Sequence, residues 1–509
     1  MRIVPAQVHL VTYDAMKHAS LSILLLLLLT GLSGAATEPE PAVRPNIVWI
    51  LGEDMGPELG FLGTPEVQTP NLDGLAARGM VFTHAFTTSP VCSPSRSAFN
   101  TGMYQTTIGV HNHRSHRRDD PSPYPFPLPE GVRLISDWLR HAGYFTGNIR
   151  HFPEGIDFQG TGKTDWNFSY DGKPFDTDRW ADLKSRQPFY AQVNFPETHR
   201  GRAWDEAHTR IPQPADPDKV ILPPYYPDHP VVREDWAQYL NTVMSLDRKV
   251  GAVLALLEAD GLADHTVVIF MGDHGRAMVR SKQWPYDSGL HVPLIIYWPP
   301  SMPPPAHYEA GTVSDRLVSA IDVTATTLAL AGVPKPERMQ GRRFLGEDAE
   351  EPRRYVFSGR DRGDETVDRI RTVRSGRYRY IRNFMPERPF LQINRYKEAT
   401  YPTIWALRKL HADGQLTPSQ ARLLAPDRPR EELYDLHADP YEIDNLAALP
   451  DQQEILKQMR AVLDRWIGET DDQGRFPEDP RVIEYYEQKM KDNYDERIDA
   501  LRRQWGFSN

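Results

Sequence analysis

A buried strand that ends in two acids is encoded by PNIVWILGED, residues 45–54. The segment from Ile47 to Leu51 is apolar without a break, which is typical of a strand covered on both faces. Ligands of open α/β sheets bind beyond the carboxyl ends of the strands. Glu53 and Asp54 are therefore candidate functional residues.

A second strand ends in the same way. The run TVVIF, residues 266–270, is followed by GDHG, residues 272–275. Because parallel strands end at one edge of the sheet, Asp273 and His274 can converge on Glu53 and Asp54. Such an oxygen-rich set suits Ca²⁺ or Mg²⁺, whereas zinc would need more histidines or thiolates. The alternative is that each acid merely caps a helix or a turn.

Strands and helices alternate over the first two thirds of the chain. Further strands are predicted at 81–82, 144–146, 189–193 and 292–297, and helices at 72–80, 97–101 and 231–258. A loop from Thr87 carries Cys92 through Arg96. This alternation predicts an α/β fold with a large mixed, mostly parallel sheet sandwiched by helices.

The pattern changes after about residue 345. Alternation at 371–374 and 378–382 predicts an antiparallel hairpin, and 433–436 could add a strand. Helices are expected at 453–466 and 484–505, the last either docked or a solvated tail. We therefore predict a catalytic domain at 37–345 and a smaller C-terminal α+β domain at 346–509.

The N-terminus resembles an export signal. An apolar run from Leu21 to Leu32 follows Lys17 and precedes small residues at 33–36. It is too short for a stable membrane span, although an uncleaved anchor is the alternative. We predict a signal peptide at 1–36 and a secreted or periplasmic protein, and we favour a bacterial source.

Composition narrows the function classes. The formal net charge of −10 argues against a nucleic-acid partner. The chain has one cysteine, Cys92, whereas exported proteins usually carry several or none. Cys92 is therefore either buried and inert or chemically active.

The residues from Cys92 to Arg96 read Cys-x-Pro-x-Arg, and Thr101-Gly102 follows. With this motif the chain resembles the sulfatase family, formylglycine-dependent enzymes of the alkaline-phosphatase-like superfamily. Glu53-Asp54 matches the family's first metal pair, in which the first position is more often Asp, and Asp273-His274 matches the second. The resemblance implies Ca²⁺, or Mg²⁺, held by these four residues and residue 92.

The resemblance also implies the chemistry. A formylglycine-generating maturation enzyme would oxidise Cys92 to formylglycine, and the hydrate of its aldehyde would attack sulfur. The expected activity is that of a sulfuric ester or sulfamate hydrolase.

Basic residues would surround the sulfuryl group, because its negative charge needs fixed positive charge nearby. The resemblance implies that Arg96 braces the hydrate and the metal ligands, and that Lys282 contacts the sulfate. His199 matches the family's second histidine, a general acid. The first active-site lysine is carried onto Lys163. The histidine that usually accompanies it is missing, and His151 is a substitute or is not involved.

The C-terminal segments 369–374, 379–384 and 466–472 resemble the heparan N-sulfatase (sulfamidase) branch. The implied substrate is a sulfated carbohydrate of glycosaminoglycan type, as in heparan sulfate degradation. Arginines such as Arg360, Arg362 and Arg369 could pair with its sulfate or carboxylate groups, or form surface ion pairs. A histidine cluster at His111, His113 and His116 lines the pocket or belongs to a hydrated loop.

Two other functions stay open. A phosphonate or phosphodiester hydrolase of the same superfamily would share the motif. A non-catalytic glycan-binding protein would leave Cys92 unconverted. A homodimer is also left open.

Overall fold

The computed structural model describes residues 44–116 and 125–507. The predicted signal peptide lies outside these residues. No helix among the described residues is long and apolar enough to cross a membrane.

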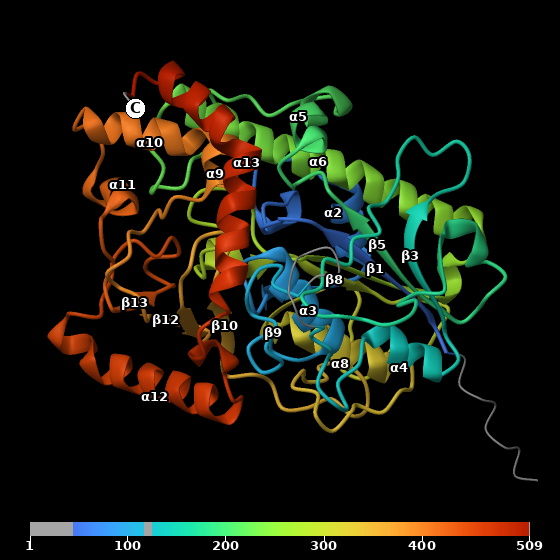
Figure 1. Cartoon of the computed structure of the whole chain (residues 1–509). Coiled ribbons are helices and arrows are strands. Elements are labelled where there is room, and N and C mark those ends of the chain that lie inside the picture. Colours follow the sequence, from blue (N-terminus) through green and yellow to red (C-terminus); the bar gives the residue numbers. More distant parts are fainter. Residues whose placement is uncertain (1–43, 117–124, 508–509) are drawn as a thin grey trace, which may run out of the picture. The chain divides into compact units, whose positions relative to one another are not determined.

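A nine-stranded sheet forms the centre of the fold (Figure 1). Its strand order is β4-β3-β5-β1-β6-β8-β2-β7, with β9 added beside β2. The strands are β1 (Asn46–Gly52), β2 (Met80–Phe86), β3 (Phe145–His151), β4 (Thr177–Arg179), β5 (Phe189–Phe195), β6 (Thr266–Gly272), β7 (His291–Val292), β8 (Leu294–Tyr297) and β9 (Thr312–Ser319).

The sheet is mostly parallel, as predicted. The pairs from β4 through β6 are all parallel, and so is β2 with β9, whereas β7 and β8 run antiparallel to their neighbours. The single strand predicted at 292–297 is wrong, because two strands flank Pro293. Proline has no N–H to donate to a ladder, so it interrupts the pairing.

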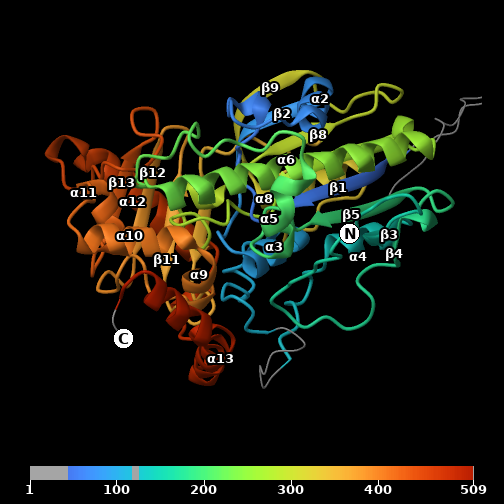
Figure 2. The same ribbon diagram turned by 90° about the horizontal axis from the view of Figure 1, so that it is seen from above.

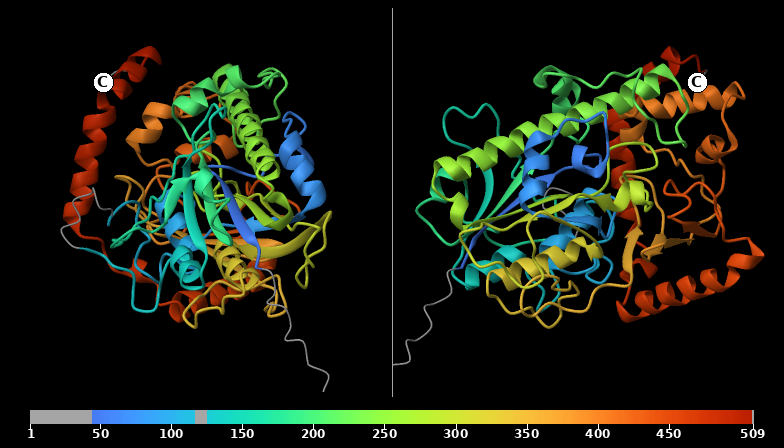
Figure 3. Two further views of the ribbon diagram at one scale, coloured as in Figure 1. Left: turned by 90° about the vertical axis from the view of Figure 1, so that its right-hand side faces the viewer. Right: turned by 180° about the vertical axis from the view of Figure 1, so that it is seen from behind.

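Helices cover both faces, and strand β1 explains why. Val48 and Ile50 point to one apolar cluster, which includes α2 (Pro70–Arg78) and the long α6 (Pro230–Ala259). Ile47, Trp49 and Leu51 point to a second cluster, with α3 (Cys92–Thr101), α4 (Ile135–His141) and α8 (Ala320–Leu330). Figure 2 shows α6 lying along the sheet, and Figure 3 shows α6 and α8 on opposite sides of it. Successive side chains of a strand point to opposite faces of the sheet. Because helices cover both faces, every side chain of β1 is buried.

Helix α3 begins earlier than the sequence predicts. A loop was expected through Arg96, yet Cys92 is already the first helical residue. Pro94 is compatible with the first turn, where its missing N–H would have no intrahelical partner. Ser97 and Thr101 donate back to the carbonyls of Ser93 and Ser97. The cysteine therefore sits at a helix N-terminus.

The C-terminal part contains a second, antiparallel sheet. Its order is β10 (Val356–Arg360), β11 (Ile370–Arg374), β12 (Tyr378–Asn383) and β13 (Glu431–Asp435), which confirms the predicted hairpin. The remaining helices are α5 (Arg202–Glu206), α7 (Asp287–Leu290), α9 (Arg395–Thr400), α10 (Pro402–Ala412), α11 (Pro418–Ala421), α12 (Gln453–Glu469) and α13 (Pro480–Gln504).

The terminal helix α13 is docked, so the solvated-tail alternative is wrong. Val482, Tyr486, Met490 and Ile498 are buried. The Tyr486 hydroxyl donates to the carbonyl of Arg114 at 2.6 Å. The described residues form one compact unit, and the boundary near residue 345 stays a prediction.

Candidate active site

The two acidic strand ends meet. Asp54 follows β1 and Asp273 follows β6, and both side chains are fully buried. The Asp54 N–H donates to Asp273 Oδ1 at 2.8 Å. Asp54 has a φ of 52°, a left-handed conformation that is costly for a residue other than glycine. The bond to Asp273 holds this conformation and aims the Asp54 carboxylate into the site.

Cys92 lies against this pair of acids. Its Sγ is 3.2 Å from His274 Nε2 and 3.6 Å from Asp54 Oδ1. One ligand atom from each of Asp54, Cys92, Asp273 and His274 lies within 4.8 Å of the others. The predicted set therefore converges, except that Glu53 is outside the group.

The electrostatics of this group favour a cation. Burial lowers the pKa of His274, but Asp273, Asp54 and Cys92 raise it to about 10. The raised pKa of His274 means that this group of residues stabilises a positive charge. Two carboxylates and an imidazole also match the donors that a divalent cation accepts. The residues present thus fit the metal that the family resemblance implies.

Arg96 connects helix α3 to both strands. Its Nε donates to Asp273 Oδ2 at 2.8 Å, and its Nη1 donates to Asn194 Oδ1 at 2.7 Å. Nη2 is buried without a hydrogen-bond partner. Burial would lower the pKa of Arg96, but Asp273 and Glu53 raise it, so the guanidinium stays charged. A buried, charged N–H group is thus available in the site.

Two lysines add positive charge. Lys282 Nζ is 2.6 Å from Asp54 Oδ2, and Lys163 Nζ is 2.9 Å from Glu53 Oε2. Burial raises the pKa of the Asp54 carboxyl, but Lys282, His199 and His274 outweigh it and hold the pKa well below its usual range. The ion pair with Glu53, the residue before Asp54, holds Lys163 next to the site.

His199 is neutral in this environment. Burial, followed by Lys282, lowers its pKa to about 4. Its Nδ1 lies 2.9 Å from the carbonyl oxygen of Arg200, and a carbonyl can only accept, so Nδ1 carries the hydrogen. Nε2 is then an acceptor, a state opposite to that of a general acid ready to donate.

The two predicted substrate-binding residues lie outside this cluster. The His151 side chain is 53% exposed and 3.5 Å from Asp178. Because β5 separates β3 from β1, the end of β3 lies about 10 Å from Asp54. Arg369 stacks on Phe384, with its Cζ 4.1 Å from the ring centroid, and lines a separate cavity.

Two arginines that were candidates for contacts with substrate or for surface ion pairs lie inside the protein. Arg360 and Arg362 are buried and pair with Asp368 and Glu478, so they form ion pairs inside the protein rather than at its surface. His111 and His113 are also buried, which makes the hydrated-loop alternative wrong for both.

Sequence reasoning missed Asn194 and Tyr396. Asn194, in β5, accepts from Arg96 and donates to Asn148. A polar residue within a buried strand was the available signal. The Tyr396 ring lies 5.6 Å from Lys282 Nζ and 6.3 Å from the His199 ring. Tyr396 comes from helix α9, which no motif connects to the site.

This fold and site define a sulfatase. Residues 45–333 match the sulfatase family, and residues 272–397 match the family of N-sulphoglucosamine sulphohydrolase C-terminal regions. The chain therefore belongs to the sulfatase family and is a sulfuric ester or sulfamate hydrolase.

Individual relatives agree with this assignment. An ulvan-active sulfatase of Formosa agariphila is 35% identical over 484 residues, covering 87% of this chain and 78% of the relative. Human N-sulphoglucosamine sulphohydrolase is 29% identical over 487 residues, covering 88% and 93%. The solved structure of a 2-O GAG sulfatase superimposes with a TM-score of 0.60 at 21% identity, covering 86% of this chain and 96% of that one. That structure supports the fold alone.

Proposed function

We propose that the protein removes sulfate from a sulfated carbohydrate of glycosaminoglycan type, with N-sulfoglucosamine as the preferred unit. The observation that carries this proposal is the position of Cys92 Sγ, 3.2 Å from His274 and 3.6 Å from Asp54. The two relatives, one active on ulvan and one on N-sulphoglucosamine, support a carbohydrate substrate.

Asp54, Asp273, His274 and residue 92 would hold Ca²⁺ or Mg²⁺. A divalent cation polarises a sulfuryl oxygen and favours deprotonation of a nearby hydroxyl. Glu53 would act indirectly rather than as a metal ligand, because its carboxylate accepts hydrogen bonds from Lys163 and from the Thr161 hydroxyl.

Residue 92 would act as formylglycine. One hydroxyl of the aldehyde hydrate would lose its proton and bond to sulfur while the sugar oxygen or nitrogen leaves with a proton. The second hydroxyl would then lose its proton, the C–O bond to sulfate would break, and the aldehyde would re-form. A geminal diol thus releases sulfate without a second attack by water.

Arg96, Lys163 and Lys282 would stabilise the negative charge on the sulfuryl oxygens. Arg96 offers its free Nη2 N–H groups, and the two lysines are held by ion pairs with Glu53 and Asp54. Preorganised cations in a buried site are worth more than in water, since no solvent must reorganise.

His199 would become the general acid only after substrate binds. An anion beside a neutral imidazole raises the pKa of that imidazole. The bound sulfate group would therefore favour protonation of His199 at Nε2. That proton would then pass to the leaving oxygen or nitrogen.

The predicted export of the protein is compatible with this maturation route. A signal peptide would place the protein outside the cytoplasm, and a formylglycine-generating enzyme would act on Cys92 before or during export. A single cysteine is consistent with that use.

The test uses full-length protein matured in its native host. Peptide mass spectrometry across Cys92 and release of sulfate from N-sulfated and 6-O-sulfated glucosamine are measured together. We expect an aldehyde at residue 92, faster release from the N-sulfated sugar, and loss of release in Cys92→Ala. Arg377→Ala, at an exposed ion pair with Asp435, is the control.

Three outcomes would contradict the proposal. An unmodified thiol with no turnover indicates a binding protein. Faster hydrolysis of an aryl phosphodiester than of an aryl sulfate indicates the phosphodiesterase alternative. Faster release from 6-O-sulfated glucosamine overturns the N-sulfated preference.

A further inference from the structure

A groove outside the catalytic centre is lined by residues that follow helix α3 and by residues of the C-terminal part. It consists of a cavity of about 310 Å³ and an adjoining one of about 280 Å³. His111, Asn112 and Phe476 line both. We call these two cavities the anion groove, for the reasons that follow.

Arg369 lines the larger cavity of this groove. No ion pair of its guanidinium occurs among residues 44–116 and 125–507, and its Nε is buried without a hydrogen-bond partner. The Phe384 ring stacks on it, with Cζ 4.1 Å from the centroid. An arginine held in place by an aromatic ring with free N–H donors is poised for an oxyanion.

The acids around Arg369 are engaged elsewhere. Asp361 pairs with Arg371, and Asp368 pairs with Arg428, each at 2.9 Å. Glu478 pairs with Arg362. Each of these carboxylates therefore has an arginine partner other than Arg369.

Two further polar groups face the same space. His111 is only 8% exposed, and its Nδ1 has no hydrogen-bond partner. Arg475 also lines the first cavity, where its guanidinium pairs with the exposed Asp471 and donates to the carbonyl of Asp472 at 3.0 Å. Unpartnered buried polar atoms are costly, and a ligand in the groove would satisfy them.

The groove also offers an apolar face. The Phe476 side chain, 57% exposed, lies under Arg475, whose Cζ is 4.5 Å from the ring centroid. An aromatic surface beside cations suits a sugar ring, which is apolar on its faces and polar at its rim.

The segment 111–114 connects the groove to the centre. His111 lies in the groove, and the N–H of Arg114 donates to Ser93 Oγ at 3.0 Å, next to Cys92. Three residues span at most about 10 Å. The lining residue His111 therefore lies within about 10 Å of the residue that bonds to the start of α3, and a sugar unit next to the one at Cys92 would have to cover a distance of this order.

We propose that the anion groove binds a second anionic group of the substrate, a carboxylate or sulfate on the neighbouring sugar, through Arg369 and His111. The substrate is then a polyanionic glycan rather than an isolated sulfated sugar. This inference rests on the proposed function, because the neighbouring sugar is the one bonded to the sugar that loses sulfate.

The experiment compares two disaccharides with matured protein. Both carry N-sulfoglucosamine, one with a uronate carboxylate on the neighbouring unit and one with that carboxylate reduced to an alcohol. We expect Arg369→Ala to lower kcat/KM at least about 10-fold for the uronate compound, because a charge-assisted hydrogen bond is lost. The reduced compound should change less than about 2-fold, and Arg369→Lys should recover part of the loss.

Arg382→Ala is the matched control. Arg382 stacks on the same Phe384 ring, with its Cζ 5.8 Å from the centroid, but does not line the groove. Equal losses on both disaccharides, or an equal loss in the control, would overturn the inference. A disaccharide with an O-sulfate in place of the uronate tells which anion is preferred.

Binding separates this inference from the proposed function. Calorimetry with Cys92→Ala protein measures affinity for the uronate disaccharide without turnover. Tighter binding of the uronate compound than of the reduced one, abolished by Arg369→Ala, supports the groove even if sulfate release is never observed. Equal binding of both compounds refutes it even if the sulfatase is active.

Discussion

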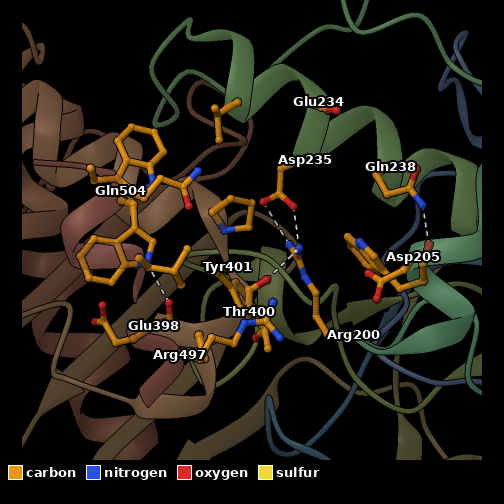
Figure 4. A pocket seen from close by; sticks show the side chains of 17 residues that line it. Arg200, Asp205, Glu234, Asp235, Gln238, Glu398, Thr400, Tyr401, Arg497 and Gln504 are labelled. Carbon is orange, nitrogen blue, oxygen red and sulfur yellow. Dashed lines mark hydrogen bonds and ion pairs between the residues drawn. The ribbon is translucent and has the colours of Figure 1, made fainter. Parts of the chain in front are cut away.

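Replacement of Arg200 by methionine should destabilise the protein strongly. Figure 4 shows the Arg200 side chain between Asp235 and Thr400, in a pocket of about 410 Å³. Its Nη1 and Nη2 donate to the two Asp235 oxygens at 2.6 and 3.1 Å, and Nη1 also donates to the Thr400 carbonyl at 3.2 Å. The guanidinium also stacks between Trp204 and Tyr401, with Cζ 4.0 and 4.5 Å from the ring centroids.

The magnitude follows from the buried carboxylate that is left behind. Asp235 is 5% exposed, and removal of one partner of such a buried pair costs about 3–5 kcal/mol. The unfolding entropy of a chain of this size is on the order of 1 kcal/mol/K, so the melting temperature should fall by about 3–5 °C. Methionine retains much of the apolar stem, which limits the loss from packing.

Scanning calorimetry of Arg200→Met, Asp235→Asn and the double variant measures the coupling. The double variant should lose less than the sum of the single losses, because neither partner leaves an unpaired charge. A fall of less than 1 °C, or strictly additive losses, would refute the reasoning that the pair is energetically important.

The remaining predictions concern the centre and its pH dependence. Arg96→Lys should lower kcat on an aryl sulfate at least about 10-fold, because one ammonium cannot replace the separate bonds to Asp273 and Asn194. Ca²⁺ at 100 times its Kd should stabilise Cys92→Ala protein by about 2.7 kcal/mol, seen as a rise in melting temperature, and Asp273→Asn should abolish that rise. Burial lowers the pKa of His291 to about 4, so the unfolded chain binds its proton first as the pH falls. Between pH 6.5 and 4 this histidine should remove roughly 3 kcal/mol of stability, and urea denaturation of His291→Gln should show a correspondingly smaller loss. No difference in that pH dependence would contradict the assignment of His291 as neutral.

The acidic strand ends were predictable because topology fixes them. In a parallel sheet β1 and β6 must end at one edge, so the meeting of Asp54 and Asp273 follows from two short sequence patterns. The pairing of Glu53 with Lys163 was not predictable in this way. It requires segment 160–163 to fold back, held by Gly160 and Thr161 N–H groups on the carbonyls of Arg150 and Asn194.

The arginines of the C-terminal part illustrate the opposite difficulty. A charged residue in a sequence is usually exposed, so Arg360 and Arg362 were expected at a surface or against substrate. Their acids, Asp368 and Glu478, come from segments that no local pattern connects to them. Whether such ion pairs are buried is decided by tertiary packing, which single-sequence patterns do not contain.

The site is assembled around Asp273 rather than around the cysteine. Its backbone carbonyl accepts from Ser95, its Oδ2 accepts from Arg96, and its Oδ1 accepts from the N–H of Asp54. Three bonds from one residue thus fix helix α3 and the end of β1 relative to β6. Because Cys92 begins α3, the positive end of the helix dipole lies at its side chain. One aspartate at a strand end therefore orients Cys92, holds Asp54 in place and keeps Arg96 charged beside them.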